Sequence, residues 1–331
     1  MKAIVQERYG APEAVLKLKE IDRPVPGPDQ VLVRMRASSV NTPDWIGVTG
    51  VPYLLRVGGT RRREDTVRGS DVAGIVEQTG TAVTDLKPGD EVFGSLWTSE
   101  LTTAGAFAEY ALVPADQLAP KPAEVSFEEA AASVMSGVTA LCAMRDTVKV
   151  GEGMRVLVNG ASGGVGTFAV QFAAHFGAEV TGVCGPSNVA MVRDLGAHHV
   201  IDYSRVDFTR ESERYDVILD NVLNHPPSRT ARALAPGGVL IPNSVGNSGG
   251  MFAGLGRMAR AKLLGLTHRA DVRFSPSEAT RENLNAIGGL LASGAITAVI
   301  DRSYTLEETP KAIAHMLGHH ARGNIVIIVP D

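Results

Sequence analysis

The stretch Arg155-Val-Leu-Val-Asn-Gly-Ala-Ser-Gly-Gly-Val-Gly166-Thr-Phe-Ala-Val-Gln171 decides the fold of this 331-residue chain. An apolar run at 156–158 leads into a glycine-dense turn, and the turn opens into a segment with helical apolar periodicity. A strand, a glycine turn and a helix in this order can bind a pyrophosphate group. Backbone N–H groups and the positive helix end point at the anion, and the glycines let the main chain approach it. The stretch therefore predicts a dinucleotide-binding domain on a parallel sheet.

The bulk composition is ordinary for a globular enzyme. The length allows two domains, and 44% hydrophobic and 21% charged residues are usual proportions. A net charge of -4 gives no basic field that would recruit nucleic acid or anionic lipid. The N-terminus lacks the apolar core of a secretory signal, and no apolar run approaches the roughly 20 residues of a spanning helix. We therefore expect a cytoplasmic protein with neither a nucleic-acid nor a membrane partner.

The two cysteines, Cys142 and Cys184, limit the chemistry further. A disulfide framework is not expected from so few, and a four-cysteine structural zinc site within one chain is excluded.

The organisation of the chain changes twice. Residues 1–122 have a β-rich pattern, because short alternating runs are broken by Pro and Gly clusters. A capping box at Ser126 and Glu129 then precedes an Ala-rich helix, after which strands and helices alternate as in a parallel sheet. A final pattern of helix, strand, helix and strand is expected to rejoin the first sheet. We predict one domain from 1–122 and 275–331, and a dinucleotide-binding domain from 123–274.

The expected strands are short apolar runs bounded by turn residues. They lie at 3–5, 31–37, 72–78, 91–94 and 106–113, then at 156–158, 179–184, 199–202, 217–220 and 239–242, and finally at 298–301 and 325–329. Helices are expected at 280–293 and 306–317, and Gly196 is placed to end another helix.

Six motifs occur in a fixed order along the chain. They are Asn41-Thr-Pro-Asp44, Gly69-Ser-Asp-Val-Ala-Gly-Ile-Val76, Leu86-Lys-Pro-Gly-Asp-Glu-Val-Phe93, Gly105-Ala-Phe-Ala-Glu-Tyr110, the glycine turn, and Arg322-Gly-Asn-Ile-Val-Ile-Ile328. In these motifs the chain resembles the medium-chain dehydrogenase/reductase superfamily, in its zinc-free quinone-oxidoreductase-like branch. The resemblance implies an α/β protein with a Rossmann doubly wound parallel sheet and a GroES-like β-barrel domain. It also implies a homodimer.

Zinc-dependent members of this superfamily hold catalytic zinc with a cysteine and a histidine–glutamate pair. By resemblance, Asn41 stands at the first cysteine and Ser70-Asp71 replaces the pair. An amide and a hydroxyl are poor zinc ligands, so we expect no metal site and exclude zinc-dependent alcohol oxidation. The expected reaction is hydride transfer to a quinone or an α,β-unsaturated carbonyl. A zinc-free carbonyl reductase and an NADPH-binding sensor without turnover stay open as alternatives.

Residues of the glycine turn and the following strand ends are the cofactor candidates. Fingerprint positions fall at Ala161, Gly163 and Gly166, with Gly164 as an extra glycine and Ser162 and Val165 between them. Cys184 ends the next strand, where NAD-binding members place an acid that would repel a 2′-phosphate, so we expect NADPH. The hydrogen-bond donors expected for that phosphate are Ser187, Asn188 and Tyr203. By resemblance, three residues lie near the nicotinamide: Thr139, Val222 and Val245.

The catalytic candidates come from the first domain and rest on the resemblance. Asn41, Asp44 and Tyr53 fall on the segment that lines the family's cleft, and a tyrosine of similar enoyl reductases donates a proton there. That tyrosine aligns with Pro52, one position from Tyr53. Tyr53 could equally be an aromatic packed at a loop edge. For Asn41 we favour the cleft role over that of a turn-forming amide, whereas Asp44 fits a helix N-terminal acid at least as well as a catalytic role.

The segment 246–271 mixes basic and apolar residues. It could form an amphipathic helix at a membrane surface. A lid or a subunit contact is the interpretation we favour for this segment.

Overall fold

The computed structural model describes residues 1–51, 66–97, 105–244, 255–267, 270–318 and 321–330. The chain divides into two compact units. The first comprises Met1–Gly50, Leu55–Val138 and Glu278–Asp331, and the second consists mainly of Thr139–Ser277. The domain boundaries after 122 and 274 remain proposals.

The first unit is built on two sheets, a larger mixed one that is mostly antiparallel and a smaller antiparallel one. In the larger, β3 (Gln30–Val40), β5 (Asp71–Thr79), β6 (Glu91–Ser95) and β8 (Leu118–Pro120) follow one another, and β7 (Tyr110–Pro114) pairs with β3. The smaller joins β2 (Leu16–Glu20), β1 (Lys2–Gln6) and β4 (Thr66–Val67). Alternating side chains of β3, such as Val31, Val33 and Met35, are buried in the core.

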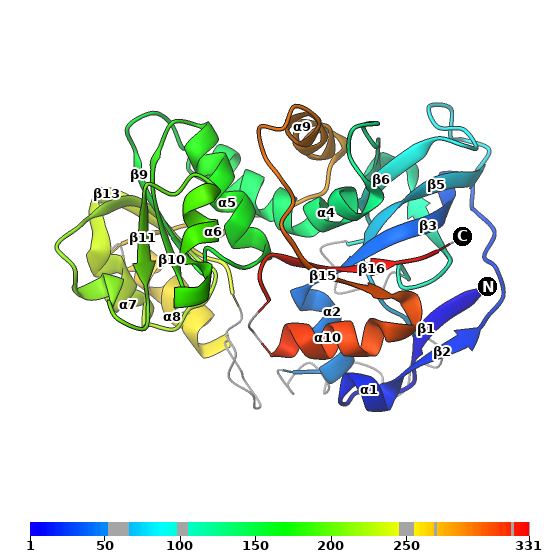
Figure 1. Cartoon of the computed structure of the whole chain (residues 1–331), viewed down its shortest axis with the longest axis horizontal. Coiled ribbons are helices and arrows are strands. Elements are labelled where there is room, and N and C mark those ends of the chain that lie inside the picture. Colours follow the sequence, from blue (N-terminus) through cyan, green and yellow to red (C-terminus); the bar gives the residue numbers. More distant parts are fainter. Residues whose placement is uncertain (52–65, 98–104, 245–254, 268–269, 319–320, 331) are drawn as a thin grey trace. The chain divides into compact units, whose positions relative to one another are not determined.

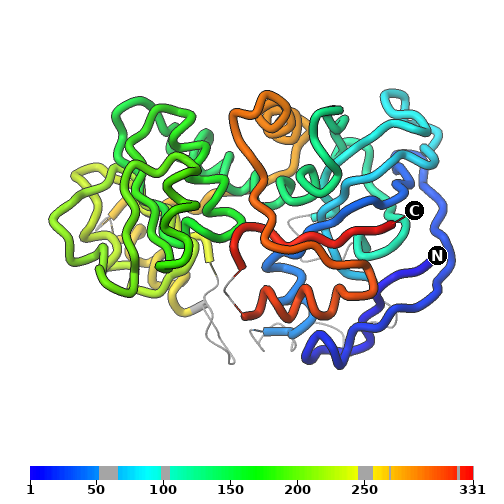
Figure 2. The backbone as a smooth tube through the Cα atoms, in the orientation of Figure 1, coloured from blue at the N-terminus to red at the C-terminus, as the bar shows by residue number. Residues whose placement is uncertain are grey.

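The chain's last strands complete the larger sheet of the first unit. β16 (Asn324–Ile328) pairs antiparallel with β3 and parallel with β15 (Ile300–Thr305), so the expectation that the terminal strands rejoin the first sheet is confirmed (Figure 2). The helices of this unit are α1 (Pro12–Val15), α2 (Thr42–Thr49), α9 (Arg281–Ala292), α10 (Thr309–Leu317) and most of α4 (Phe127–Leu141), which crosses into the second unit after Val138.

Two strand predictions need correction. The run 106–113 forms a strand only from Tyr110, because Phe107 N–H bonds Arg68 O at 2.7 Å and Ala108 makes an isolated bridge to Ala3. The strand predicted at 298–301 is β15 at Ile300–Thr305, whose polar residues pair in register with β16. The limits of both strands were predicted wrongly from apolar residues alone, because hydrogen-bond partners determine where each strand begins and ends.

The second unit contains a six-stranded parallel sheet in the order β11-β10-β9-β12-β13-β14 (Figure 1). The strands are β9 (Arg155–Asn159), β10 (Glu179–Cys184), β11 (His199–Asp202), β12 (Tyr215–Asp220), β13 (Leu234–Pro242) and β14 (Asp271–Val272). Counted from β9, this is the doubly wound order 3-2-1-4-5-6. The predicted Rossmann sheet is therefore confirmed, and its order reverses between β9 and β12.

Helices connect the strands of this parallel sheet. They are α5 (Gly164–His175), α6 (Val189–Asp194), α7 (Pro227–Thr230) and α8 (Leu255–Leu266). Gly196, just beyond α6, has φ +107°, as expected of a glycine that ends a helix. The predicted capping box before α4 (Phe127–Leu141) is confirmed, since Ser126 N–H and Glu129 N–H bond each other's side chains at 2.9 and 3.2 Å. No helix within the described residues is long and apolar enough to cross a membrane.

Candidate functional site

A buried polar cluster lies where β3 ends and β5 begins. The antiparallel register that pairs Ala37 with Ala73 places Ser39 opposite Asp71. Ser39 Oγ donates to Asp71 Oδ2 at 2.5 Å, and Asn41 Nδ2 donates to the same oxygen at 2.7 Å. The backbone N–H of Met135 on α4 also points to this oxygen at 3.3 Å. Three segments distant in sequence therefore converge on one carboxylate.

The two oxygens of Asp71 differ in their surroundings. Oδ2 receives all three of these hydrogen bonds, whereas the buried Oδ1 receives none with good geometry within the described residues. Burial raises the pKa of Asp71 to about 6, and the bonds from Ser39 and Asn41 oppose that rise, as does the nearby Ser70 hydroxyl. Asp71 therefore titrates near the pH at which a general acid operates. The sequence signalled this residue only as one half of the replaced histidine–glutamate pair.

Asn41 and Asp44 form the start of α2. The Asn41 N–H donates to Asp44 Oδ2 at 2.7 Å, so Asp44 does act as a helix N-terminal acid. Burial raises the pKa of Asp44 to about 7, with Asp71 adding to the rise and the Asn41 bond opposing it. Two carboxyl groups that titrate near neutrality thus flank Asn41.

The donor chemistry of this cluster does not fit zinc. Asn41 presents an amide N–H to Asp71, not a lone pair, and Ser39 contributes a hydroxyl. Among the described residues, the only zinc-type ligands here are therefore the carboxylates of Asp44 and Asp71, which already accept hydrogen bonds. Zinc prefers thiolate, imidazole and carboxylate ligands. Over the ranges that the structure describes, no group of three His, Cys, Asp or Glu side chains is arranged to hold a metal.

The glycine turn in the second unit contains two glycines that the fold requires and one that it does not. Gly160 has φ +79°, and a Cβ at Gly166 would lie 2.0 Å from Gly160 O, so both positions require glycine. Gly163 has φ -84°, and a Cβ there would lie 3.6 Å from its nearest neighbour. The fold therefore tolerates a side chain at Gly163. The missing side chain leaves the backbone at Gly163 open to the approach of a ligand.

The first turn of α5 supplies donors for an anion. The first hydrogen bond back to Gly163 O comes from Thr167 at 2.9 Å, so the N–H groups of Gly164, Val165 and Gly166 precede the helical bonding pattern. Positive helix-end charge and open N–H groups bind phosphate. This geometry fits the pyrophosphate of a dinucleotide.

A side-chain network holds the end of β12 beside this turn, and the sequence analysis missed it. Asn159 Nδ2 donates to Asp220 Oδ1 at 2.7 Å and to Asn224 Oδ1 at 3.0 Å. The Leu223 N–H also donates to Asp220 Oδ1, at 2.9 Å, and burial raises the pKa of Asp220. Val222 lies on the loop after β12, and its Cγ2 would lie 2.9 Å from a Cβ at Gly160. The sequence did contain a signal for this network, because the polar residues Asn159 and Asp220 end two strands that lie side by side.

The predicted 2′-phosphate residues gather at the ends of β10 and β11. The Tyr203 N–H donates to Cys184 O at 3.1 Å, and the Tyr203 hydroxyl would lie 3.2 Å from a Cβ at Gly185. Ser187 is exposed and Asn188 half-buried on the short turn Pro186–Asn188. The structure thus brings four predicted residues to one edge: Cys184, Ser187, Asn188 and Tyr203.

The sequence analysis did not predict two charged residues at this edge, Asp202 and Arg205. Burial and the nearby Asp202 raise the pKa of the Cys184 thiol to about 11, so the thiol is neutral at physiological pH. Asp202 itself accepts hydrogen bonds from Ser204 N–H and Oγ at 2.9 and 2.7 Å, which lower its pKa. Arg205 lies 3.5 Å from Asp202 and is largely exposed. An acid–base pair therefore flanks Tyr203.

Other predicted residues are less informative. Thr139 is buried on α4, and its role remains a prediction. Tyr53 and Val245 lie outside the described residues. Asn324, which replaces a lysine usual in the closing motif, accepts a hydrogen bond from Ser136 Oγ at 2.7 Å and so ties β16 to α4.

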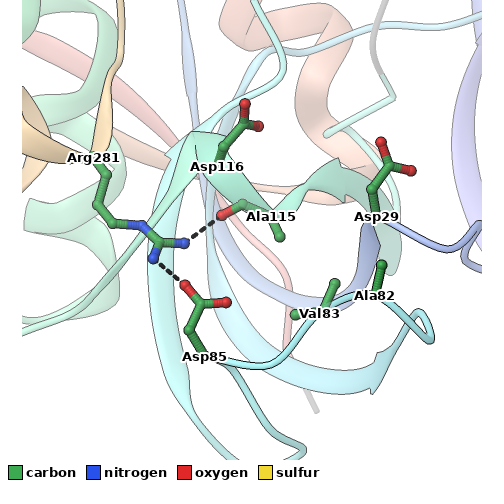
Figure 3. A pocket seen from close by; sticks show the side chains of 7 residues that line it. All are labelled: Asp29, Ala82, Val83, Asp85, Ala115, Asp116 and Arg281. Atoms are coloured by element: carbon green, nitrogen blue, oxygen red, sulfur yellow. Dashed lines mark hydrogen bonds and ion pairs between the residues drawn. The ribbon is translucent and has the colours of Figure 1, made fainter.

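A surface hollow of about 500 Å³ in the first unit contains none of the predicted site residues (Figure 3). Arg281 lies at its edge, pairs with Asp85 and donates to Ala115 O at 2.6 Å and Leu118 O at 2.9 Å. Its guanidinium therefore fastens α9 to the β sheet, so we interpret this hollow as structural.

Comparison with known proteins adds two family models. The model of the alcohol dehydrogenase GroES-like domain matches residues 27–123, and that of zinc-binding dehydrogenases matches residues 195–327. The GroES-like identity of the first unit is thereby confirmed. The zinc in the second description finds no suitable ligand set at Asn41 and Asp71.

Full-length relatives share this architecture. The chain is 30% identical to a chloroplastic quinone-oxidoreductase homologue of Spinacia oleracea, over 99% of the chain and 98% of the relative. It is 31% identical to a trans-enoyl reductase of Aspergillus terreus, over 98% and 94%. The quinone oxidoreductase of Escherichia coli complexed with NADPH superposes with a TM-score of 0.82 at 25% identity, over 99% and 100% of the two chains.

Proposed function

The chain belongs to the quinone-oxidoreductase-like branch of the medium-chain dehydrogenase/reductase superfamily, and we propose that it transfers hydride from NADPH to a quinone or an α,β-unsaturated carbonyl without zinc. One observation carries the proposal. The position that, by resemblance, holds zinc ligands in the dehydrogenases is a hydrogen-bond network in which Ser39 and Asn41 donate to Asp71. No Lewis acid would polarise a carbonyl there, so an already electrophilic acceptor fits best.

The nicotinamide supplies the hydride when NADPH is bound. The protein's own part is to position the acceptor and to donate hydrogen bonds to its developing oxyanion. We assign these donations to Asn41 and Tyr53, with solvent as the alternative proton source. Because Asn41 Nδ2 already donates to Asp71 Oδ2 and Ser39 Oγ, Asn41 would exchange its bond to Ser39 for the acceptor. Asp71 and Asp44 titrate near 6 and 7, so either could return a proton to the Asn41 region.

Binding of the cofactor is assigned to the second unit. The turn from Ala161 through Ser162, Gly163, Gly164, Val165 and Gly166 would hold the pyrophosphate, and the loop at Val222 would meet the carboxamide, together with Val245. The preference for NADPH rests on the neutral Cys184 and on the donors Tyr203, Ser187 and Asn188. The relative whose structure contains NADPH supports this choice.

The acceptor class draws on the names of two relatives, one a quinone-oxidoreductase homologue and the other a trans-enoyl reductase. Both acceptors undergo hydride attack at carbon conjugated to a carbonyl, and both place the resulting charge on oxygen. A homodimer also remains a prediction.

The deciding experiment measures anaerobic NADPH oxidation against a panel of quinones, enones, enoyl thioesters and saturated ketones, repeated with NADH. We expect turnover with the first three classes and a preference for NADPH. Turnover of saturated ketones alone would establish a carbonyl reductase. Cofactor binding without any turnover would establish a sensor.

The role of Tyr53 has its own test. Tyr53→Phe should lower turnover about tenfold or more if its hydroxyl donates to the acceptor, a loss in the usual range for one general acid. An unchanged rate would make Tyr53 a packing residue and leave the proton to solvent or Asp71.

A further inference from the structure

Helix α8 exposes large apolar side chains on its outer side. Within the described residues, three of the seven exposed large apolar side chains fall between positions 263 and 274. Leu263 is 59% exposed, Leu266 68% and Phe274 42%. Apolar side chains gathered on a surface mark a place where something binds.

The helix has two distinct sides. Ala261 is fully buried, Gly265 packs close to Val272 of β14, and Arg257 donates to Leu223 O. These residues define the inward side, which packs on the second unit. Leu263 and Leu266 are three positions apart and therefore share the outward side.

Basic side chains border the outward apolar stripe. A rotation of about 100° per residue places Arg260 beside Leu263 on one border and Lys262 beside Leu266 on the other. Both basic residues are exposed. From Leu255 to Ala270 the sequence has no Asp or Glu, although the whole chain carries a net charge of -4. An apolar stripe between basic borders is the pattern of a helix that lies in a membrane interface.

We propose that the outward side of α8 docks on an anionic lipid bilayer, with Leu263 and Leu266 in the headgroup–acyl boundary and Arg260 and Lys262 on lipid phosphates. A second copy of the chain fits less well. An isologous contact through this side of α8 would bring the basic borders of two copies together, with no acid in the segment to balance them. Anionic headgroups supply the missing charge.

This inference departs from the expectations of a lid or subunit contact and of no membrane partner. The reason is the orientation of α8, which the sequence did not reveal: the leucines face outward and Arg257 faces inward.

Docking here would bring the bilayer close to the loop after β12. Arg257 of α8 bonds Leu223, which directly follows Val222. A lipid-soluble quinone could then be reached from the bilayer, a consequence that rests on the proposed function. The docking itself does not depend on it.

Co-sedimentation with vesicles tests the docking, without NADPH or quinone present. The wild-type chain should sediment with vesicles of phosphatidylcholine mixed with phosphatidylserine, and much less with phosphatidylcholine alone. Leu263→Glu/Leu266→Glu and Arg260→Glu/Lys262→Glu should each lower vesicle affinity about tenfold or more. Added salt should weaken wild-type binding, because the headgroup attraction is screened.

Matched variants elsewhere serve as controls. Val25→Glu changes another exposed apolar side chain, and Lys17→Glu/Arg232→Glu makes an equal charge change at exposed positions. Both controls should bind vesicles as the wild type does. Circular dichroism and NADPH oxidation with a water-soluble quinone should be unchanged in every variant, which shows that each one folds.

No vesicle binding by the wild type, or equal loss in the control variants, would overturn the docking proposal. Absent vesicle binding together with a fall in solution mass on Leu263→Glu/Leu266→Glu would assign this side to a second copy instead. A chain that reduces quinone in solution yet ignores vesicles refutes docking alone. A chain that binds vesicles yet reduces no quinone or enone refutes the proposed function alone.

Discussion

The glycine turn of the second unit and the Asp71 cluster of the first are built on opposite principles. The turn offers backbone N–H groups that the fold leaves open, and its side chains are small or absent. In the cluster, two side chains and one backbone N–H from distant segments donate to a single carboxylate oxygen. A backbone site is specified by local glycine spacing, whereas a side-chain site needs segments that only the folded chain brings together.

The largest expected effect concerns Gly163. Gly163→Ala should raise the NADPH dissociation constant about a thousandfold, roughly 4 kcal/mol, because the new methyl group occupies the approach of the pyrophosphate. The free energy of unfolding should change by less than about 1 kcal/mol, since φ -84° suits alanine and the nearest atom lies 3.6 Å away. Fluorescence titration and chemical denaturation measure the two quantities.

Gly166→Ala is the contrasting variant. Its methyl group would lie 2.0 Å from Gly160 O, so we expect a loss of about 3 kcal/mol or more in the free energy of unfolding. If Gly163→Ala and Gly166→Ala lower the free energy of unfolding equally, the fold requires glycine at position 163 as well. The open space beside Gly163 is then no evidence for a ligand.

The second prediction introduces charge at the other end of the cofactor site. Cys184→Asp should lower kcat/KM for NADPH about a hundredfold, near 3 kcal/mol, because a carboxylate would repel the 2′-phosphate at short range. Activity with NADH should change little. Cys184→Ser is the neutral control. Equal losses in the two variants would show that packing at the end of β10, not charge, explains the effect.

The two regions differ in how far the sequence predicted them. Strands β10 and β11 lie where the sequence placed them, and the doubly wound order follows from alternating strands and helices. The glycine turn was also predicted, since its residues are contiguous. Strand β15 was misplaced because its polar residues form a strand only through pairing with β16.

The chemistry of the first unit was predicted only in part. Asn41 and Asp44 were named through the resemblance, but the bonds from Ser39 and Met135 to Asp71 were not foreseen. These residues are separated by up to 96 positions, from Ser39 to Met135, and no local pattern connects them. The perturbed pKa of Asp71 follows from burial, which becomes visible only in the fold.

The third prediction tests the cluster through its protons. The folded-state pKa of Asp71 is raised to about 6, so its contribution to stability is full below about pH 4 and is lost as pH rises through 6. Asp71→Asn should remove this loss and make the chain about 3 kcal/mol more stable than the wild type at pH 8. Denaturation at a series of pH values measures the difference.

Asp71→Asn is suited to this test because an amide oxygen can replace Oδ2 and keep all three hydrogen bonds. The amide nitrogen then takes the place of the unpartnered Oδ1. Asp71→Ala breaks these bonds and should be less stable than the wild type at every pH. A wild-type stability that does not fall between pH 4 and 7 would mean that the carboxylate is better solvated than its burial suggests.

The smallest expected effect returns to the open edge of the second unit. Tyr203 is 59% exposed, and its hydroxyl is the part assigned to the 2′-phosphate. Tyr203→Phe should raise KM for NADPH about threefold to tenfold, the ordinary net contribution of one hydrogen bond at a solvent-exposed position, and leave NADH unaffected. The ring would still pack over Gly185 and the backbone bond to Cys184 would remain, so the fold should be unchanged.

The measurement for Tyr203→Phe is the ratio of kcat/KM for NADPH to kcat/KM for NADH. The control is Tyr215→Phe, on β12 of the same sheet, which should leave that ratio unchanged. A Tyr203 variant that weakens NADPH and NADH equally would place the ring against the adenosine instead. Recognition at this edge would then depend on shape more than on charge, and the preference for NADPH would have to come from Ser187, Asn188 and Arg205.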